Sequence, residues 1–419
     1  MTCSQSSYND IFASGLMPYD EALSRVLSGL PGVDGCERLL IEKARGRTLH
    51  KSVTSTLNVP SFTNSAVDGY ALHSRDIPEQ GFKKLAVKNV AFAGQPFDGV
   101  VEAGECLRIM TGAPIPEQLD TVIMQEHVEP ENGYINIDNR CRAGKNVRKA
   151  GEDIRIGDTV LAAGRLLVPP DIGLLAALGI SEVEVNRKLT IAVASTGNEV
   201  YVPGQSLGAG GLYDSNRYSL MAALARPDVE VVDLGILPDD VDVLLKSFND
   251  AGCHADVIIS SGGVSVGEAD YTKMALQNSG KVDFWRVAIK PGRPFAFGRI
   301  GNAAFFGLPG NPVAVLVTFY FFVLPALEKM LQVTDKPIMP TFKACATEDL
   351  RKLPGRTEVQ RAIISRNEKG EWQVKTTGKQ GSGILSSMSR ANAFIILDHD
   401  SGSVSTGEQV TVMPFSAIF

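Results

Sequence analysis

Apolar positions at helical spacing mark the first predicted elements of the chain. Between residues 17 and 30, alanine, leucine and valine recur at intervals of three and four residues, which predicts an amphipathic helix. The segments 36–49 and 171–179 are each predicted to form a further helix. From 53 to about 148 the pattern changes to short alternating runs broken by glycine and proline. This change predicts a small β-rich module inserted between the helical segments.

Strands and helices alternate from residue 188 to about 331. Val/Ile-rich runs at 189–196, 229–237 and 255–263 are each followed by a helical pattern, at 215–225, 241–251 and 268–276. This order predicts an α/β fold with a mostly parallel sheet that is covered on both faces. In such sheets ligands bind at the carboxyl ends of the strands, so the site is expected there.

Two more patterns complete the predicted architecture. The most apolar run, 312–327, is interrupted by Pro325 and is shorter than a bilayer span, which predicts a core helix. The last segment, 337–419, again alternates strand and turn residues. It is predicted to form a compact β-barrel or sandwich.

Composition and charge exclude several classes of protein. The 419 residues are 44% hydrophobic and 21% charged, which excludes a disordered or collagen-like chain and suggests two to four domains. The formal net charge is −6 and no Lys/Arg-rich block occurs, which argues against a nonspecific nucleic-acid binder. The six cysteines lack zinc-site spacing, and the N-terminal residues lack a signal-peptide pattern. We expect a cytoplasmic protein that binds neither nucleic acid nor membrane.

A glycine-rich loop follows the predicted strand at 255–263. Gly262, Gly263 and Ser265 stand where backbone N–H groups and a helix N-terminus could receive a phosphate, although a simple strand–turn–helix joint has the same pattern. The loop also matches the G-x-S-x-G motif of serine hydrolases. That alternative needs a downstream histidine, and His399 is the only one in the sequence after Ser265.

Carboxylates follow several of the predicted strands. Glu199, Asp239, Asp240 and Asp270 each lie close after a strand of the α/β segment. Singly, each is best explained as a helix N-cap. Together, at one edge of the sheet, they predict a hard oxygen site for Mg²⁺ that carries substrate phosphates.

A basic segment follows, with the sequence FWRVAIKPGRPFAFG. If Trp285 to Lys290 forms one strand, Arg286 and Lys290 share a face, and Arg293 lies just beyond it. In a protein of negative net charge these cations form a local trap for an anion. A solvated strand face paired with acids is the alternative.

Turn regions supply the remaining candidates. Pro309 and Pro312 flank the N-cap residue Asn311 of the apolar helix, which is either another anion site or only a helix cap. Asp68 precedes a glycine in a tight turn of the β-rich module, and Thr111 lies in a Gly/Pro turn of the same module.

These segments resemble the molybdopterin molybdenumtransferases, the MoeA family that includes the gephyrin E domain. The resemblance covers essentially the whole chain in the expected order. It implies a homodimer of four-domain subunits: a helical dimerisation domain of 14–53 and 148–187, an inserted β-rich domain of 54–147, a molybdopterin-binding α/β domain of 188–336 and a C-terminal β-barrel of 337–419. The matching text is FTNSAVDGYA, RIMTGAPIPE, GEDI, STGNE, YDSNR, ISSGGVSVGEADYTK, FWRVAIKPGRPFAFG, GLPGNPVAVLVTFY, PGRTEVQR and TGKQGSG.

The resemblance also implies an activity and roles for single residues. The family inserts molybdate into adenylated molybdopterin with Mg²⁺, releases AMP and leaves molybdenum cofactor. The resemblance implies that the cleft is completed across the dimer and that other pathway proteins are partners. It assigns activity to the acids Glu199, Asp239 and Asp270, anion binding to Arg286 and Lys290, functional roles to Asp68 and Thr111 of the inserted domain, and cleft positions to Arg361 and Ser382 of the C-terminal domain.

Three positions depart from the commonest family pattern. Asn198 and Thr63 stand where the family often has Asp, and Arg286 where Lys is frequent. Asn198 removes one anionic candidate ligand, which leaves the set of Mg²⁺ ligands undetermined.

A competing hypothesis is a non-catalytic scaffold, since gephyrin relatives also anchor other proteins. This hypothesis predicts that the acidic or the basic site residues are lost, and both are present here.

Overall fold

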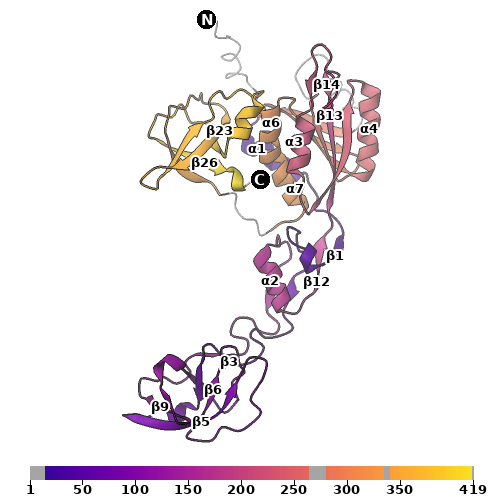
Figure 1. Ribbon diagram of the computed structural model, residues 1–419. Helices are drawn as coiled ribbons and strands as arrows, with labels where there is room; N and C mark the ends of the chain where they lie inside the picture. Colours follow the sequence, from indigo (N-terminus) through magenta and orange to yellow (C-terminus); the bar gives the residue numbers. More distant parts are fainter. Residues whose placement is uncertain (1–14, 264–279, 335–339, 418–419) are drawn as a thin grey trace.

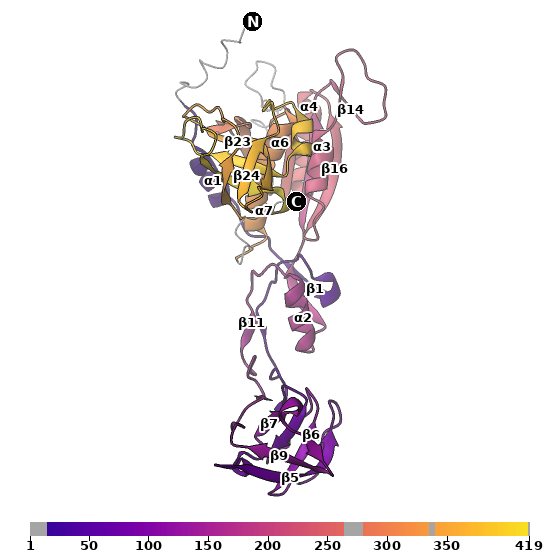
Figure 2. The ribbon, with the colours of Figure 1, turned by 60° about the vertical axis from the view of Figure 1, so that its left-hand side comes forward.

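The computed structural model describes residues 15–263, 280–334 and 340–417. The molecule is elongated in both views (Figures 1 and 2). An α/β body and a C-terminal barrel lie side by side at one end, and a β-rich module lies at the other. A narrow middle segment joins the two ends.

The α/β body is built on a six-stranded mixed sheet. Its first four strands are parallel, and the last two continue the sheet through antiparallel pairings. The predicted mostly parallel sheet is therefore confirmed. In spatial order the strands are β16 (Val229–Leu237), β13 (Leu189–Thr196), β17 (Val257–Ser261), β21 (Ala303–Leu308), β20 (Pro294–Ile300) and β18 (Gly280–Arg286).

Alternating side chains bury this sheet on both faces. Ala192 and Ile258 pack toward α4 (Val241–His254), where they meet Phe248. Ile191 and Ile259 point to the opposite face, which is covered by α3 (Asn216–Ala223) and the long apolar helix. Figure 1 shows α4 on one side of the sheet and α3 on the other. The period of two along each strand thus produces the two-sided burial that the Val/Ile-rich runs predict.

The long apolar helix runs without a break from Pro312 to Met330. It consists of α6 (Pro312–Thr318), a π-helical turn (Phe319–Val323) and α7 (Leu324–Met330). The expectation that this segment is interrupted at Pro325 and too short to span a bilayer is wrong, because the helix continues through Pro325 to Met330. The π-helical turn ends two residues before Pro325. At 19 residues the helix is long and apolar enough to cross a membrane, but 83% of its most apolar window is buried inside the protein. The predicted core helix is confirmed. N-terminal helix α1 (Tyr19–Ser28) packs against α7.

The C-terminal body is a closed five-stranded barrel, which decides between the predicted barrel and sandwich. Closure comes from the pairing of β23 with β25, after which each strand has two neighbours. Helix α8 (Leu385–Arg390) precedes β25, and the short β19 (Ile289–Lys290) of the α/β body adds to β23 in parallel. The barrel strands are β22 (Phe342–Ala346), β23 (Thr357–Arg366), β24 (Trp372–Thr376), β25 (Ala393–Leu397) and β26 (Gln409–Pro414).

The middle segment contains two strand pairs and one helix. β1 (Cys36–Leu40) pairs with β12 (Glu182–Asn186), β2 (Val53–Thr54) pairs with β11 (Thr159–Leu161), and α2 (Pro169–Ala177) packs beside them. The helix predicted over 36–49 is wrong, because this segment forms β1 and a 3-10 turn instead. Pairing with the distant β12 outweighs the local helical pattern.

The β-rich module leaves the middle segment after β2 and returns to it at β11. It contains a six-stranded sheet and a short pair, β3 (Asn64–Ser65) with β10 (Val147–Arg148). The sheet has two apolar clusters of its own. In spatial order its strands are β7 (Thr121–Met124), β4 (Gly69–Leu72), β6 (Glu105–Ile109), β5 (Phe82–Ala91), β9 (Tyr134–Asp138) and β8 (Pro130–Glu131).

Candidate active site

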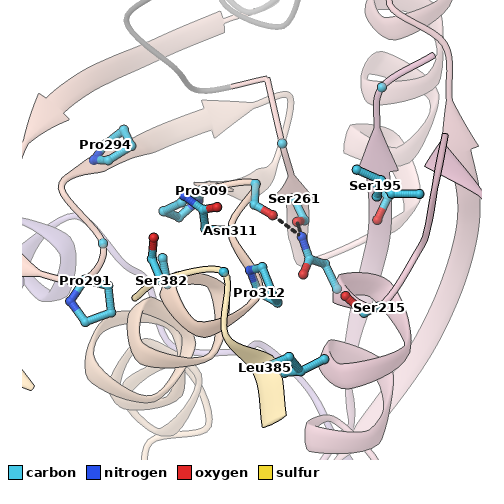
Figure 3. A pocket seen from close by; sticks show the side chains of 18 of the residues that line it. Ser195, Ser215, Ser261, Pro291, Pro294, Pro309, Asn311, Pro312, Ser382 and Leu385 are labelled. Carbon is cyan, nitrogen blue, oxygen red and sulfur yellow. Dashed lines mark hydrogen bonds between the residues drawn. The ribbon is translucent and has the colours of Figure 1, made fainter. Parts of the chain in front are cut away.

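A cavity of about 1050 Å³ lies where the carboxyl ends of β13, β17 and β21 meet the C-terminal barrel. The α/β body contributes the strand ends, the start of α3 and the turn 309–312, and the barrel contributes Arg356 and the loop 380–383. Figure 3 shows Ser195, Ser261 and Pro309 on the α/β side, with Ser382 and Leu385 facing them. The cavity therefore lies at the sheet edge where the α/β pattern predicts a ligand.

Two acidic side chains line one part of this cavity. Glu199 and Asp239 follow β13 and β16, and both contribute to the lining. Asn198 connects them: its Oδ1 accepts from the Asp239 N–H at 3.1 Å, and its own N–H donates to Asp239 Oδ2 at 3.4 Å. Asp240 instead caps α4, because its carboxylate accepts from the N–H groups of residues 242 and 243. Asp270 lies outside the described residues.

The glycines at the end of β17 have backbone conformations that favour glycine. Gly262 and Gly263 have φ values of +95° and +65°. A Cβ on Gly262 would lie 2.8 Å from the Thr196 carbonyl oxygen. The Gly262 N–H donates to the Leu308 carbonyl at 3.1 Å, so this N–H continues the sheet ladder and is not available to a phosphate. Ser265 lies outside the described residues.

The basic segment differs from its prediction. The single strand expected over 285–290 is two strands, because β18 ends at Arg286 and β19 begins at Ile289, where it pairs with the barrel. Arg286 and Lys290 therefore do not share one strand face, and Arg286 is not among the described lining residues. Lys290 lines the cavity and donates to Glu358 at 3.1 Å, with 47% of its side chain exposed. Arg293 and Arg356 line the cavity as well.

The predicted turn before the apolar helix also reaches the cavity. Pro309 and Pro312 both line it, and Asn311 is the N-cap residue of α6 as predicted, although its side chain makes no capping hydrogen bond. Ser382 of the barrel lies opposite, and its carbonyl accepts from the Val313 N–H at 3.1 Å. This bond joins the barrel loop to the first turn of the helix.

Arg361 has a different position from the one implied by the resemblance. Its side chain is 1% exposed and does not line the cavity. The guanidinium donates to Ser387 Oγ at 3.0 Å and to the Gly381 carbonyl at 2.9 Å, and burial lowers the pKa of Arg361 to about 10. Arg361 thus holds the barrel loop that forms the cavity wall, while the loop itself faces the cavity.

Asp68 and Thr111 meet in the β-rich module. The Asp68 carboxylate accepts from both the N–H and the hydroxyl of Thr111 at 2.7 Å, and these bonds lower the pKa of Asp68. The sequence places the two residues in separate turns, and the fold brings them together. Figure 1 shows the β-rich module at the opposite end of the molecule from the barrel. Within one chain, therefore, Asp68 and Thr111 do not reach the cavity.

Several lining residues were not singled out from the sequence. Asn216 donates to the Ser261 hydroxyl and to the Gly310 carbonyl, and Asp214 accepts from Ser195. Gln380 of the barrel exchanges hydrogen bonds with the backbone of residue 361. The segments YDSNR and TGKQGSG carry these residues, and a polar cluster at the start of a helix is the signal that was available. None of the described lining residues is a histidine, and His399 lies elsewhere on the barrel, hydrogen-bonded to its neighbour.

Comparison with known proteins gives a consistent result along the chain. Three family models match in order: the MoeA N-terminal region (domains I and II) at residues 17–179, a probable molybdopterin binding domain at 192–329, and the MoeA C-terminal region (domain IV) at 343–415. A molybdopterin molybdenumtransferase of Haemophilus influenzae is 44% identical, and the match covers 96% of this chain and 99% of that protein. Gephyrin of Dictyostelium discoideum is 32% identical over 97% of this chain and 62% of its own length. A crystal structure of the molybdopterin biosynthesis MoeA protein from Pyrococcus horikoshii OT3 superimposes with a TM-score of 0.83 at 30% identity, covering 95% of this chain and 100% of that one.

Proposed function

The chain belongs to the MoeA family, and on that premise we propose that it inserts molybdate into adenylated molybdopterin and releases AMP. A transferase role in molybdenum cofactor biosynthesis follows from the family itself. The single observation that supports the specific reaction is the composition of one cavity. It presents the carboxylates of Glu199 and Asp239 together with the cations Lys290 and Arg293. A substrate with a phosphoanhydride and an incoming oxyanion needs both kinds of group.

The cations would attract and orient molybdate. Lys290 is half exposed toward the cavity, and its partner Glu358 on the barrel holds the ammonium in place. Two cations in a partly enclosed site attract a dianion more strongly than they would in open water. In the proposed reaction a molybdate oxygen attacks the α-phosphorus and displaces the molybdopterin phosphate from it. The dithiolene sulfurs of molybdopterin then replace this oxygen on molybdenum, and the oxygen leaves as part of AMP.

The two carboxylates of the cavity suit a Mg²⁺ ion that is held partly by the substrate. No group of three or more Asp, Glu, His or Cys side chains suited to a metal occurs among the described residues. Glu199 and Asp239 nevertheless both line the cavity, and Mg²⁺ is commonly held by one or two carboxylates plus substrate phosphates and water. In our proposal these two residues hold Mg²⁺, which would withdraw charge from the phosphoanhydride. Asn198 fixes Asp239 through their mutual hydrogen bonds.

The Asp68–Thr111 pair leads us to extend the proposal to a homodimer. The pair belongs to the β-rich module, which lies at the opposite end of the molecule from the barrel and the α/β body (Figure 2), so a second copy would supply it in trans. We also propose that the dimer works in the cytoplasm and receives its substrate from other proteins of the pathway. Among the described residues one helix is long and apolar enough to cross a membrane, and its burial inside the protein supports this location.

AMP release from purified adenylated molybdopterin tests the reaction. We expect release to require both molybdate and Mg²⁺, and to fall by at least about a hundredfold in Asp239→Ala. Asp240→Ala is the matched control, since this neighbouring carboxylate caps α4 and does not line the cavity. Release without molybdate would indicate a hydrolase instead. Tight binding of the substrate with no turnover would favour the scaffold hypothesis.

A further inference from the structure

Asn216 connects two walls of the cavity through its side-chain amide. This first residue of α3 donates from Nδ2 to Ser261 Oγ at 2.8 Å and to the Gly310 carbonyl at 2.7 Å. Ser261 ends β17, and Gly310 lies in the turn between β21 and α6. Figure 3 draws both bonds. The ends of two neighbouring strands are thereby held at a fixed separation.

The two bonds also determine the direction of the Ser261 hydroxyl. A carbonyl oxygen can only accept, so the atom that faces Gly310 must be the Asn216 NH₂ group, which then donates to Ser261 as well. Ser261 Oγ therefore accepts from Asn216, and its own hydrogen must point to another acceptor. Within the described parts of the chain, no acceptor for this hydrogen is found. Ser261 lines the cavity and is 2% exposed.

A second hydroxyl lies at the end of the adjacent strand. Ser195 of β13 is the register partner of Ser261, and Thr196 follows it beside Gly262. Thr196 lines the cavity and is 5% exposed, and its Oγ1 has no hydrogen-bond partner among the described residues. A Cβ on Gly262 would lie 2.9 Å from this oxygen. A glycine at position 262 thus leaves room beside the Thr196 hydroxyl.

The frame around these hydroxyls is rigid. Asp214, two residues before α3, accepts from Ser195 Oγ and from Arg217 Nε, both at 2.8 Å. Arg217 also forms an ion pair with Asp233 on the edge strand β16. Buried polar networks of this kind fix the orientation of their members. The start of α3, and with it Asn216, is therefore held against β13 and β16.

We propose that Ser261 and Thr196 donate their hydroxyl hydrogens to a phosphate oxygen of the substrate, and that Asn216 is the positioning residue that directs Ser261. This inference rests on the proposed function, which supplies a phosphoanhydride. Phosphate oxygens only accept hydrogen bonds, so two hydroxyl donors at adjacent strand ends match them. The Gly262 N–H cannot donate to the phosphate because it already donates to the Leu308 carbonyl. The two hydroxyls would supply these donors instead.

Titration calorimetry with AMP, adenosine and adenylated molybdopterin tests the inference. We expect Ser261→Ala and Thr196→Val each to raise the Kd for AMP and for adenylated molybdopterin by roughly 10- to 100-fold, because each loses one hydrogen bond to a charged group. The Kd for adenosine should stay unchanged, since it has no phosphate. Ser261→Thr keeps a hydroxyl and should restore most of the affinity. Ser219→Ala on the same helix is the control, because Ser219 does not line the cavity.

The positioning role of Asn216 is tested by a double-mutant cycle. Asn216→Ala should weaken AMP binding in the wild-type background and have little further effect once Ser261 is alanine. Thermal melting of every variant separates a loss of folding from a loss of binding. A purely structural Asn216 would instead weaken AMP and adenosine alike, in both backgrounds.

The possible failures can be told apart. If Ser261→Ala and Thr196→Val bind AMP and adenylated molybdopterin within twofold of wild type, or lose adenosine equally, the inference is wrong, whatever the turnover assay gives. If the hydroxyl variants behave as expected but wild type shows no molybdate-dependent AMP release, only the proposed function is wrong. If wild type binds neither AMP nor adenylated molybdopterin, both the inference and the proposed function are wrong.

Discussion

Single side chains in this molecule act mainly by holding other groups in place. Asp68 is held by Thr111, Lys290 by Glu358, and the barrel loop by Arg361. Because hydrogen bonds between buried or preorganised groups are costly to leave unmade, removal of one partner has effects beyond the contact itself. The side chains that face the cavity therefore depend on residues behind them.

Thr111 lowers the pKa of Asp68. Its two hydrogen bonds favour the carboxylate and lower the pKa of Asp68 below the ordinary 3.8. The stabilisation by ionised Asp68 is therefore present above pH 3.8 and is lost as the pH falls through the lower, folded-state pKa. In Thr111→Val we expect the pKa to return toward 3.8, as measured by NMR titration of the Asp68 carboxyl carbon. Thr111→Ser keeps both donors and should titrate like wild type; equal pKa values in all three proteins would contradict this account.

Lys352 fastens one end of the barrel. It is 4% exposed, and its ammonium donates to the carbonyls of Leu353, His399 and Ser401, the last at 2.7 Å, while burial lowers its pKa. Lys352→Met removes the side-chain donor to the Leu353 and Ser401 carbonyls, while the His399 carbonyl keeps its bond from the Gly355 N–H. We therefore expect the free energy of unfolding to fall by about 2 kcal/mol. Denaturant unfolding measures this change. Lys343→Met, which removes an exposed bond to Thr411 on the same barrel, should cost less than about 0.5 kcal/mol.

At the scale of elements, the cavity wall is a loop that a buried strand residue holds. Arg361 on β23 binds the loop at Gly381 and the helix behind it at Ser387. In Arg361→Met we expect amides of residues 380–387 to exchange roughly 10- to 100-fold faster in deuterium-exchange experiments. Arg366→Met, on the same strand but with its guanidinium over the exposed face of Trp372, is the control. Unchanged exchange in Arg361→Met would show that the loop holds its own conformation.

The elements also show what the sequence could predict. The strands and helices of 188–331 follow from continuous Val/Ile runs and helical periodicity, and they place Glu199, Asp239, Lys290 and the 262–263 glycines at one cavity. Local pattern failed where a distant partner decided the structure. The helix expected over 36–49 became a strand because β12 pairs with it, and the strand expected over 285–290 divided because β19 adds to the barrel. Asn216 was missed for the same reason, since its two partners lie 45 and 94 residues away.

At the scale of the whole molecule, the separation of the Asp68–Thr111 pair from the cavity can be tested in mixed dimers. Asp68→Ala and Asp239→Ala should each be inactive alone. If the pair acts in trans, a hybrid dimer retains one complete site. A one-to-one mixture that exchanges subunits freely should then recover roughly a quarter of wild-type AMP release, because half of the dimers are hybrid and one of their two sites is intact. No recovery, despite subunit exchange seen with differently tagged chains, would mean that the pair does not serve the partner's cavity.

The path of the chain through the middle segment has a consequence for how such a molecule could arise. The chain leaves through β2 and returns through β11, and Thr54 and Thr159 face each other in that pair. Everything between them carries its own apolar clusters, separate from those of the middle segment. A short turn could therefore close the gap without unpairing any other strand. In evolutionary terms the β-rich module is a cassette: it can be acquired, exchanged or shed in one genetic event, while the rest of the protein keeps its fold.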